Sequence, residues 1–233
     1  MLFSRKVIPA STNVNIYLNN VILEQVKVTK FLGVLIDEKL NWKDHINCIK
    51  SKVSKGIGII NHVKNILPRN ILKLLYNTLV HPYLSYCNIV WGTAKVSTLN
   101  PLFLLQKRVI RMCTNSHYRA SSGPLFSQLK ILNIFDLNKY LTCIFIFKYT
   151  NNLLPSSCTF LIDLPPVTCN YTLKNVGTFK INRCKMSYKE SSVSVRGIKF
   201  WNSLPNSVST SLSIGSFKNS LHAYLSIAYS VTL

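Results

Sequence analysis

The chain has 233 residues, of which 48% are hydrophobic and 15% charged, and its 28 Lys and Arg against 7 Asp and Glu give a formal net charge of +21. This apolar content excludes wholesale disorder, and the basic excess indicates a polyanionic partner, either nucleic acid or an anionic membrane surface. No carboxylate occurs from His45 to Phe135, so chemistry that needs convergent carboxylates, such as two-metal phosphoryl transfer, has almost no ligands.

The first forty residues are predicted to form strands. The runs over 13–18 and 21–26 flank Asn19-Asn20, a dipeptide that tolerates the positive φ of a tight hairpin. A third strand is predicted over 28–36. Gly33 lies inside this run, where a glycine is typical of a bulge or of a close approach by another backbone.

A long helix is predicted next. Apolar residues recur at spacings of four and three from Ile46 to Leu67, which is typical of a packed helix. Asn41 or Asp44 is the expected cap, and Pro68 closes the helix. The acidic cluster that Asp44 forms with residues 37 and 38 is interpreted as a solvated turn and a helix start.

Further helices are predicted up to residue 150. One begins near Arg69, and another spans about Asn100 to Thr114 with Pro101 at its first position. After a short helix and a connector, the last of them is expected to be capped by Asp136.

The C-terminal third is predicted to be less regular. Residues 151–194 are interpreted as a linker with little firm structure, followed by a short strand-like run that ends near Gly197. A final amphipathic helix is expected from Ser213 to Ala228. The longest strongly apolar run, over 141–147, is far shorter than a membrane span of about 20 residues.

Basic and aromatic side chains are the candidate binding residues. The lysines of the first long helix lie off its apolar stripe, which is compatible with a solvated face or with a phosphate-facing surface. Lys107, Arg108 and Arg111 form the densest basic patch of the chain. An aromatic group, Tyr83, Tyr86 and Trp91, is interpreted as core packing, with stacking on bases as the alternative.

The cysteines do not indicate a metal centre. All seven are irregularly spaced, without a pair separated by two residues, and we interpret them as reduced, mostly buried thiols of an intracellular protein. We therefore expect no metal or cofactor in this chain, and a location in the nucleus or the cytoplasm.

Several segments of the chain, taken in order and spacing, resemble one protein family. They are VTKFLGVLIDEKLNWKDHI, LLYNTLVHPYLSYCNIVWG, LFLLQKRVIRM, LKILNIFDLNKY, GIKFWNSLP and SFKNSLHAYL. Together they resemble the reverse transcriptases of jockey-like non-LTR retrotransposons (LINEs). The resemblance implies an α+β, mainly α-helical chain. Its implied divisions are a palm edge over 1–40, a helical thumb over 41–120, a helical extension over 121–150, a linker-like segment over 151–194 and a C-terminal strand-turn and helix over 195–233.

The resemblance also implies a function. The family's aromatic-x-Asp-Asp turn is missing, so we expect a truncated RNA-directed DNA polymerase fragment that cannot polymerise alone, although the parent polymerase needs Mg²⁺. We expect it to bind primer–template (RNA–DNA hybrid, duplex or single strand) without sequence readout, and a palm and fingers from elsewhere could complement it. The expected contacts are the primer-grip residues Phe31, Leu32 and Gly33, and the phosphate-binding residues Lys50, Lys52, Lys55, Lys64, Lys107, Arg108 and Arg111.

Three alternatives remain open at this point. The chain could be a basic, apolar-faced module for membrane surfaces or protein interactions. It could be a decayed open reading frame without a selected function. An enzyme of another type is a third alternative, against which the shortage of carboxylates argues.

Overall fold

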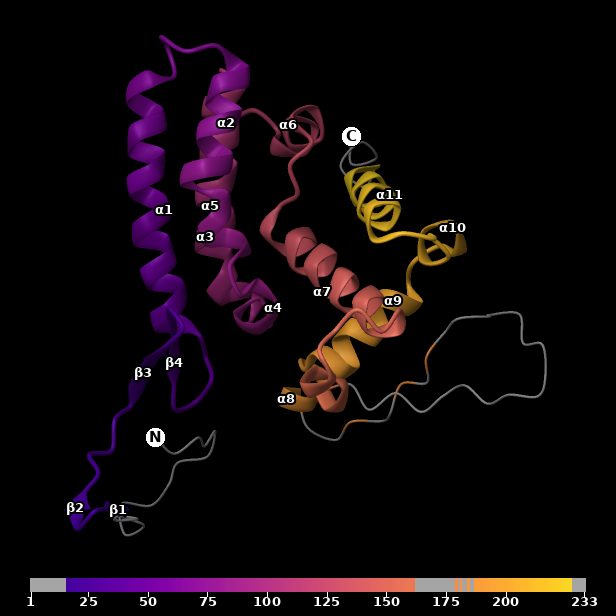
Figure 1. The fold of residues 1–233 in the computed structure, drawn as a ribbon. Helices are drawn as coiled ribbons and strands as arrows, with labels where there is room; N and C mark the ends of the chain where they lie inside the picture. Colours follow the sequence, from indigo (N-terminus) through magenta and orange to yellow (C-terminus); the bar gives the residue numbers. More distant parts are fainter. Residues whose placement is uncertain (1–15, 162–178, 180, 182–183, 185–186, 228–233) are drawn as a thin grey trace.

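A computed structural model describes residues 16–161, 179, 181, 184 and 187–227, and it is mainly helical (Figure 1). Two small hairpins precede a column of helices, and a second group of helices packs beside this column. One cluster of buried hydrophobic side chains extends through both groups, from Val34 to Leu225. The expected α+β, mainly α-helical class is therefore confirmed.

The first hairpin forms where the sequence predicts it. Strand β1 (Tyr17–Leu18) pairs antiparallel with β2 (Val21–Ile22). The two residues between them, Asn19 and Asn20, have φ values of 49° and 63°. Such positive φ values match the right-handed twist of the flanking strands, which explains the tight connection.

A second hairpin replaces the single strand expected over 28–36. Strand β3 (Val28–Phe31) pairs antiparallel with β4 (Val34–Asp37), so that Phe31 lies opposite Val34. Leu32 and Gly33 form the turn, with φ values of 45° and 81°. The prediction is wrong here because leucine rarely adopts a positive φ, so the residue before Gly33 gave no sign of a turn.

The helical column contains five helices that follow one another in the chain. They are α1 (Lys43–Val63), α2 (Arg69–Leu79), α3 (His81–Ser85), α4 (Asn88–Trp91) and α5 (Val96–Cys113). Helix α1 packs along both α5 and α2. Gly56 allows a close approach, since a Cβ atom there would lie 2.8 Å from the Leu79 carbonyl oxygen of α2.

The start of α1 differs from the prediction. Its N-cap is Trp42, with a φ of 62°, and neither Asn41 nor Asp44 caps the helix. The Asp37 carboxylate accepts hydrogen bonds from the backbone N–H groups of Lys39, Asn41 and Trp42 at 2.8–3.0 Å. The acidic residues therefore do organise a turn and a helix start, but they act on the loop before the helix.

Two other helix starts also differ from the prediction. Helix α5 begins at Val96, which places Pro101 inside the helix; the carbonyl that loses its partner belongs to the exposed Ser97, so water can satisfy it. In α7 (Ile134–Thr150) the cap is Asn133, whose side chain accepts from the backbone N–H of Asp136 and donates to its carboxylate. Asp136 thus lies in the first turn.

The second group of helices surrounds α7, and two of its members, α9 and α11, pack directly on that helix. The group includes α6 (Ser122–Leu129), α8 (Ser187–Glu190), α9 (Ile198–Asn202), α10 (Asn206–Ser209) and α11 (Ile214–Ile227), with a 3-10 helix at Ser156–Leu161. The final helix agrees with the prediction. Most of the linker-like segment predicted over 151–194 lies outside the described residues.

The strand-like run predicted before Gly197 is wrong. Residues Val193–Gly197 form a π-helical turn that continues directly into α9. The buried residues Val195, Ile198 and Trp201 recur every three positions, which is a helical spacing that the alternating valines concealed. A Cβ atom at Gly197 would lie 3.2 Å from Ile146 of α7, so this turn packs closely on that helix.

Cysteine placement agrees in part with the prediction. None of the six described cysteines is in a disulfide, and Cys169 lies outside the described residues. Burial is complete for Cys113 and Cys143, and it raises the pKa of their thiols to about 11 and about 12, whereas the other four are half-buried. None of the described helices is long and apolar enough to cross a membrane.

Stability is expected to fall in mildly acidic solution because one histidine is buried and two are half-buried. Burial lowers the pKa of His45, His81 and His222 below the ordinary value of 6.5. Below pH 6.5 the unfolded chain therefore binds more protons than the folded chain. The free energy of unfolding consequently decreases as the pH falls below 6.5, and it keeps its full value above that pH.

Urea unfolding at pH 7.5 and 5.5 measures this effect. His45 contributes because its Nδ1 accepts the backbone N–H of Leu35 at 3.3 Å, a bond that protonation removes. The variant His45→Gln is expected to show a smaller decrease between the two pH values than the parent chain. Equal stability of the parent chain at both values would contradict the linkage.

Candidate nucleic-acid interface

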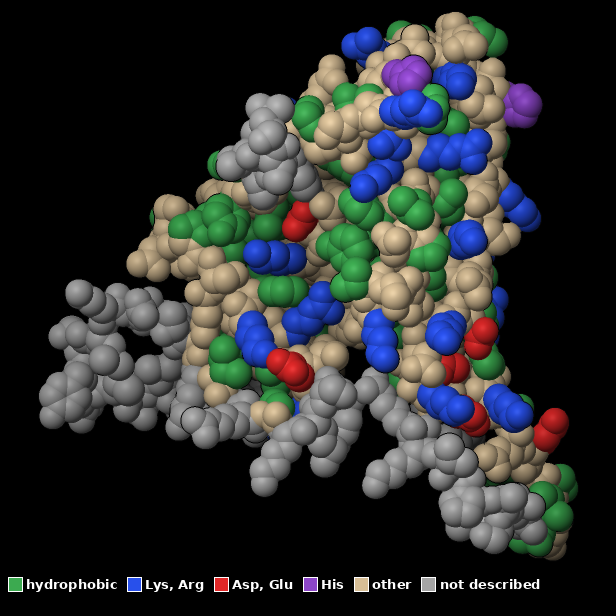
Figure 2. Space-filling view, turned by 180° about the vertical axis from the view of Figure 1, so that it is seen from behind, with side chains coloured by type: hydrophobic (Ala, Val, Ile, Leu, Met, Phe, Trp, Pro, Cys, Tyr) green, Lys and Arg blue, Asp and Glu red, His purple; other side chains and the backbone are tan. Residues whose placement is uncertain are grey.

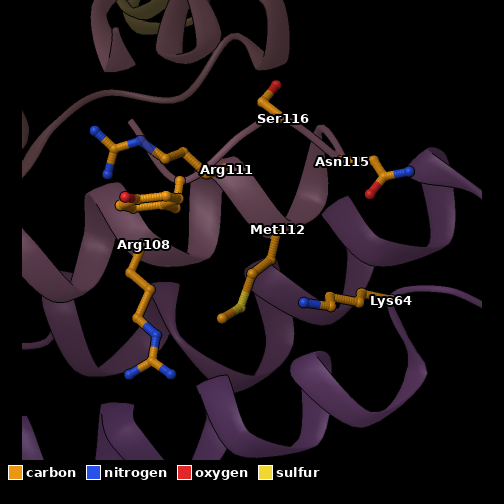
Figure 3. A pocket seen from close by; sticks show the side chains of 7 residues that line it. Lys64, Arg108, Arg111, Met112, Asn115 and Ser116 are labelled. Atoms are coloured by element: carbon orange, nitrogen blue, oxygen red, sulfur yellow. The ribbon is translucent and has the colours of Figure 1, made fainter. Parts of the chain in front are cut away.

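Three of the predicted phosphate contacts lie together at one end of the helical column. Lys64 follows the last turn of α1, and Arg108 and Arg111 lie one turn apart on α5. All three line a pocket of about 250 Å³, which we call the basic pocket (Figure 3). Its lining is completed by Met112, Asn115, Ser116 and Tyr118. Figure 3 shows Met112 between Lys64 on one side and the two arginines on the other.

The loop after α5 forms one wall of the basic pocket. Arg111 holds this loop, because its Nε donates a hydrogen bond to the Ala120 carbonyl at 2.8 Å. The backbone N–H of Ser116 donates to the Arg111 carbonyl at 2.9 Å, and Asn115 adopts the left-handed conformation with a φ of 51°. The wall that carries Tyr118 is thus fixed to the helix at both of its ends.

A row of lysines on α1 leads to the pocket. Lys43, Lys50 and Lys64 are separated by multiples of seven residues, so they lie on one flank of the helix. Ile57 has the same spacing but is buried, so the row is interrupted between Lys50 and Lys64, and Lys64 lies beside Arg108 of α5. We call these three residues the lysine stripe. It spans 21 residues, or about 31 Å at 1.5 Å per residue. Lys43 was not among the predicted contacts, although its spacing could have revealed it.

The remaining predicted cations lie elsewhere. Lys52 faces the opposite flank of α1, where its Nζ lies 5.5 Å from the centre of the Tyr83 ring of α3. Lys55 is exposed on the outer face of α1. Lys107 leans away from the basic pocket, with its Nζ 4.2 Å from the centre of the Phe103 ring. The structure therefore does not combine all seven predicted cations in one site.

The predicted primer-grip residues form the tip of the second hairpin. Phe31 and Leu32 are 63% and 73% exposed. The hairpin tip is attached to the helical column, because the Tyr86 hydroxyl donates a hydrogen bond to the Leu32 carbonyl at 2.7 Å. A Cβ atom at Gly33 would lie 3.7 Å from the same tyrosine ring. The hydrogen bond from Tyr86 therefore keeps this apolar turn in a fixed, solvent-exposed position.

The aromatic group named in the sequence divides between core and surface. Trp91 is fully buried, and its Nε1 donates to the Tyr86 carbonyl at 2.8 Å. Tyr83 and Tyr86 are exposed and lie near the hairpin tip and Lys52. Core packing is therefore the correct interpretation for Trp91 alone, and the two tyrosines are available to a ligand.

The basic surface has little acid to balance it. The described residues form one salt bridge, between Lys199 and Glu190, and it lies far from the pocket and the stripe. Figure 2 shows Lys and Arg side chains gathered around the end of the column where α1 and α5 terminate, with the acidic side chains of that face below them. Among the residues that the structure describes, no three His, Cys, Asp or Glu side chains lie close enough together to hold a metal ion.

Comparison with known proteins supports the resemblance seen in the sequence. The chain is 27% identical over 130 residues to the probable RNA-directed DNA polymerase from transposon X-element of Drosophila melanogaster, a match that covers 54% of this chain and 14% of that protein. It is 27% identical over 124 residues to the RNA-directed DNA polymerase from mobile element jockey of the same species, covering 51% of this chain and 13% of the relative. The probable RNA-directed DNA polymerase from transposon BS is 25% identical over 119 residues.

These matches define how far the similarity reaches. The chain is similar to non-LTR retrotransposon polymerases over about half of its length, and it spans no more than 14% of the length of these curated relatives. No protein-family model matches the chain. No solved structure matches it significantly.

Proposed function

We propose that this chain is the thumb-containing part of a non-LTR retrotransposon reverse transcriptase, and that it binds primer–template duplex through phosphates without reading sequence. The observation that carries the proposal is the unneutralised basic surface formed by the lysine stripe and the basic pocket. Cations in such a row can follow one strand of a duplex, because phosphates repeat regularly along it. Similarity to RNA-directed DNA polymerases supports nucleic acid as the polyanion.

The hairpin tip has a separate role in this proposal. Leu32 and Gly33 present backbone groups at a tight turn, and Phe31 presents an exposed ring beside them. Tyr86 fixes the turn to the column, so the tip needs little ordering when it meets a primer end. Phe31 and Tyr83 offer rings on which a base can stack.

Catalysis is not part of the proposal. The chain has seven carboxylates in 233 residues and lacks the aromatic-x-Asp-Asp turn of the family. The described acidic residues do not converge, so they do not fit the Mg²⁺ that the parent polymerase needs. We propose that a palm and fingers from elsewhere supply this chemistry, inside the cell. Template-dependent incorporation of nucleotides by the pure chain would contradict this part.

A competition experiment tests the proposed binding. The purified chain is titrated by fluorescence anisotropy against two labelled RNA–DNA hybrids of unrelated sequence, with unlabelled hybrid or anionic vesicles as competitor. We expect the two affinities to agree within about threefold, because phosphates carry no sequence information. Unlabelled hybrid should displace the probe and vesicles should not. Efficient displacement by vesicles, or the absence of saturable binding, would contradict the proposal.

A further inference from the structure

The basic pocket differs from the rest of the basic surface in shape and in lining. It is concave, and it combines three cations with an aromatic ring and an amide side chain. We propose that it holds one unpaired nucleotide at the end of a duplex, with the phosphate at Lys64 and Arg108 and the base against Tyr118. The proposal rests on the proposed function, since the duplex itself is bound along the lysine stripe.

The size of the pocket selects a small ligand. Its volume of about 250 Å³ is slightly below the range of about 300–1,000 Å³ found for pockets of drug-sized ligands. A base-paired duplex is much larger than this volume, so it can only lie across the rim of the pocket. A single nucleotide that has left its stack can enter, so the shape favours an unpaired end.

The lining matches the parts of a nucleotide. Lys64, Arg108 and Arg111 offer positive charge for a phosphate, and no described carboxylate lines the pocket. Tyr118 is 67% exposed, and the Arg119 guanidinium carbon lies 5.2 Å from its ring centre. A base that stacks on this ring would use the part that the Arg119 guanidinium and the His117 ring, whose centre lies 4.6 Å away, leave exposed. Asn115 adds amide groups that can bond to a base or a sugar.

The pocket is formed before any ligand arrives. The hydrogen bonds of Arg111 to Ala120 and of Ser116 to Arg111 fix the loop that carries Tyr118. Binding therefore costs little ordering of the protein. Because Arg111 holds the loop, its replacement would disturb the wall itself, and the test is better made at Arg108 and Tyr118.

The position of the pocket indicates which nucleotide it receives. The lysine stripe ends at the pocket, since Lys64 belongs to both. About 31 Å from Lys43 to Lys64 corresponds to about nine base pairs at 3.4 Å each. A strand that follows the stripe thus reaches the pocket after roughly one turn of duplex, where an unpaired extension can leave the helix.

The test compares blunt and overhanging hybrids that share one duplex of about 12 base pairs. Anisotropy titrations of the full chain use a blunt hybrid and hybrids with a short unpaired extension of either polarity. We expect at least one overhang to bind about tenfold more tightly than the blunt hybrid, the gain of stacking one base. Tyr118→Ala should reduce this affinity to that of the blunt hybrid, so that the ratio of the two affinities falls to about one.

Three variants serve as controls. Tyr118→Phe keeps the ring and should keep the preference for the overhang. Tyr17→Ala removes an exposed tyrosine of the first hairpin, to which no binding role is assigned, and should also keep it. Arg108→Ala should weaken the overhanging hybrid more than the blunt one. Circular dichroism of each variant confirms that the helices are formed.

Other outcomes would overturn the inference. Equal affinity for blunt and overhanging hybrids, or an overhang preference that survives Tyr118→Ala, would exclude the pocket as the nucleotide site while the proposed duplex binding stands. A loss of both affinities in folded Tyr118→Ala would make the tyrosine a duplex contact. Absence of binding to every hybrid would remove the proposed function and this inference together.

Discussion

Replacing Gln106 with Leu is expected to lower the free energy of unfolding by about 3–5 kcal/mol. Gln106 is fully buried on α5 and connects three elements. Its Nε2 donates to the Tyr76 hydroxyl at 2.8 Å and to the Leu132 carbonyl at 2.9 Å. Its Oε1 accepts the backbone N–H of Ile134, the first residue of α7, at 2.9 Å. Leucine has a similar volume and leaves these three polar groups buried without their partner.

Urea unfolding followed by circular dichroism measures this loss. Tyr76→Phe is a matched control, because Gln106 then keeps its bonds to Leu132 and Ile134; we expect a loss of about 1 kcal/mol. Thr78→Val on the exposed side of α2 should change stability by less than about 0.5 kcal/mol. A loss below about 1 kcal/mol for Gln106→Leu would contradict the view that this glutamine joins α7 to the column.

The double variant Lys64→Ala and Arg108→Ala is expected to weaken binding to an RNA–DNA hybrid by about 10- to 100-fold at ~0.1 M salt. Each phosphate contact that is lost means that the nucleic acid releases about one counterion fewer on binding. Both residues line the basic pocket at the end of the lysine stripe. Neither forms a salt bridge in the described part of the chain, so the fold loses little. The measurement is an anisotropy titration of both proteins.

A charge-matched control separates this effect from the loss of net charge. Lys189→Ala with Lys218→Ala also removes two exposed cations, but from α8 and α11. We expect this pair to change affinity by less than about threefold. Equal weakening by both double variants would mean that the whole charge of the protein, and not a defined surface, attracts the nucleic acid.

Periodic helices and the turn at Asn19-Asn20 could be predicted from the sequence, whereas the turn at Leu32 and the helix caps could not. The apolar spacing over 46–67 and over 213–228 is long and regular, so the helices α1 and α11 were predicted nearly to their ends. The turn at Leu32 places a leucine at positive φ, which no propensity favours. At Val195 the alternating valines resemble a strand, and the packing on α7 decides for a helical turn.

The candidate site could be predicted only in part for a related reason. The cations of α1 and α5 stand out because acids are absent around them. Their division between the basic pocket and other surfaces could not be predicted. Lys64 and Arg108 line the pocket together although 44 positions separate them, whereas the Lys107 side chain lies over the Phe103 ring. Tyr118 belongs to a loop without periodicity, so its place in the pocket depends on tertiary contacts of Arg111.

The salt dependence of binding tests the central claim most directly. The affinity of the full chain for an RNA–DNA hybrid is measured by anisotropy at several salt concentrations. If the basic pocket, the lysine stripe and the cations beside them neutralise about five phosphates, the logarithm of the association constant falls with the logarithm of salt concentration at a slope of roughly −4. A slope near zero would contradict a phosphate-binding surface on α1 and α5.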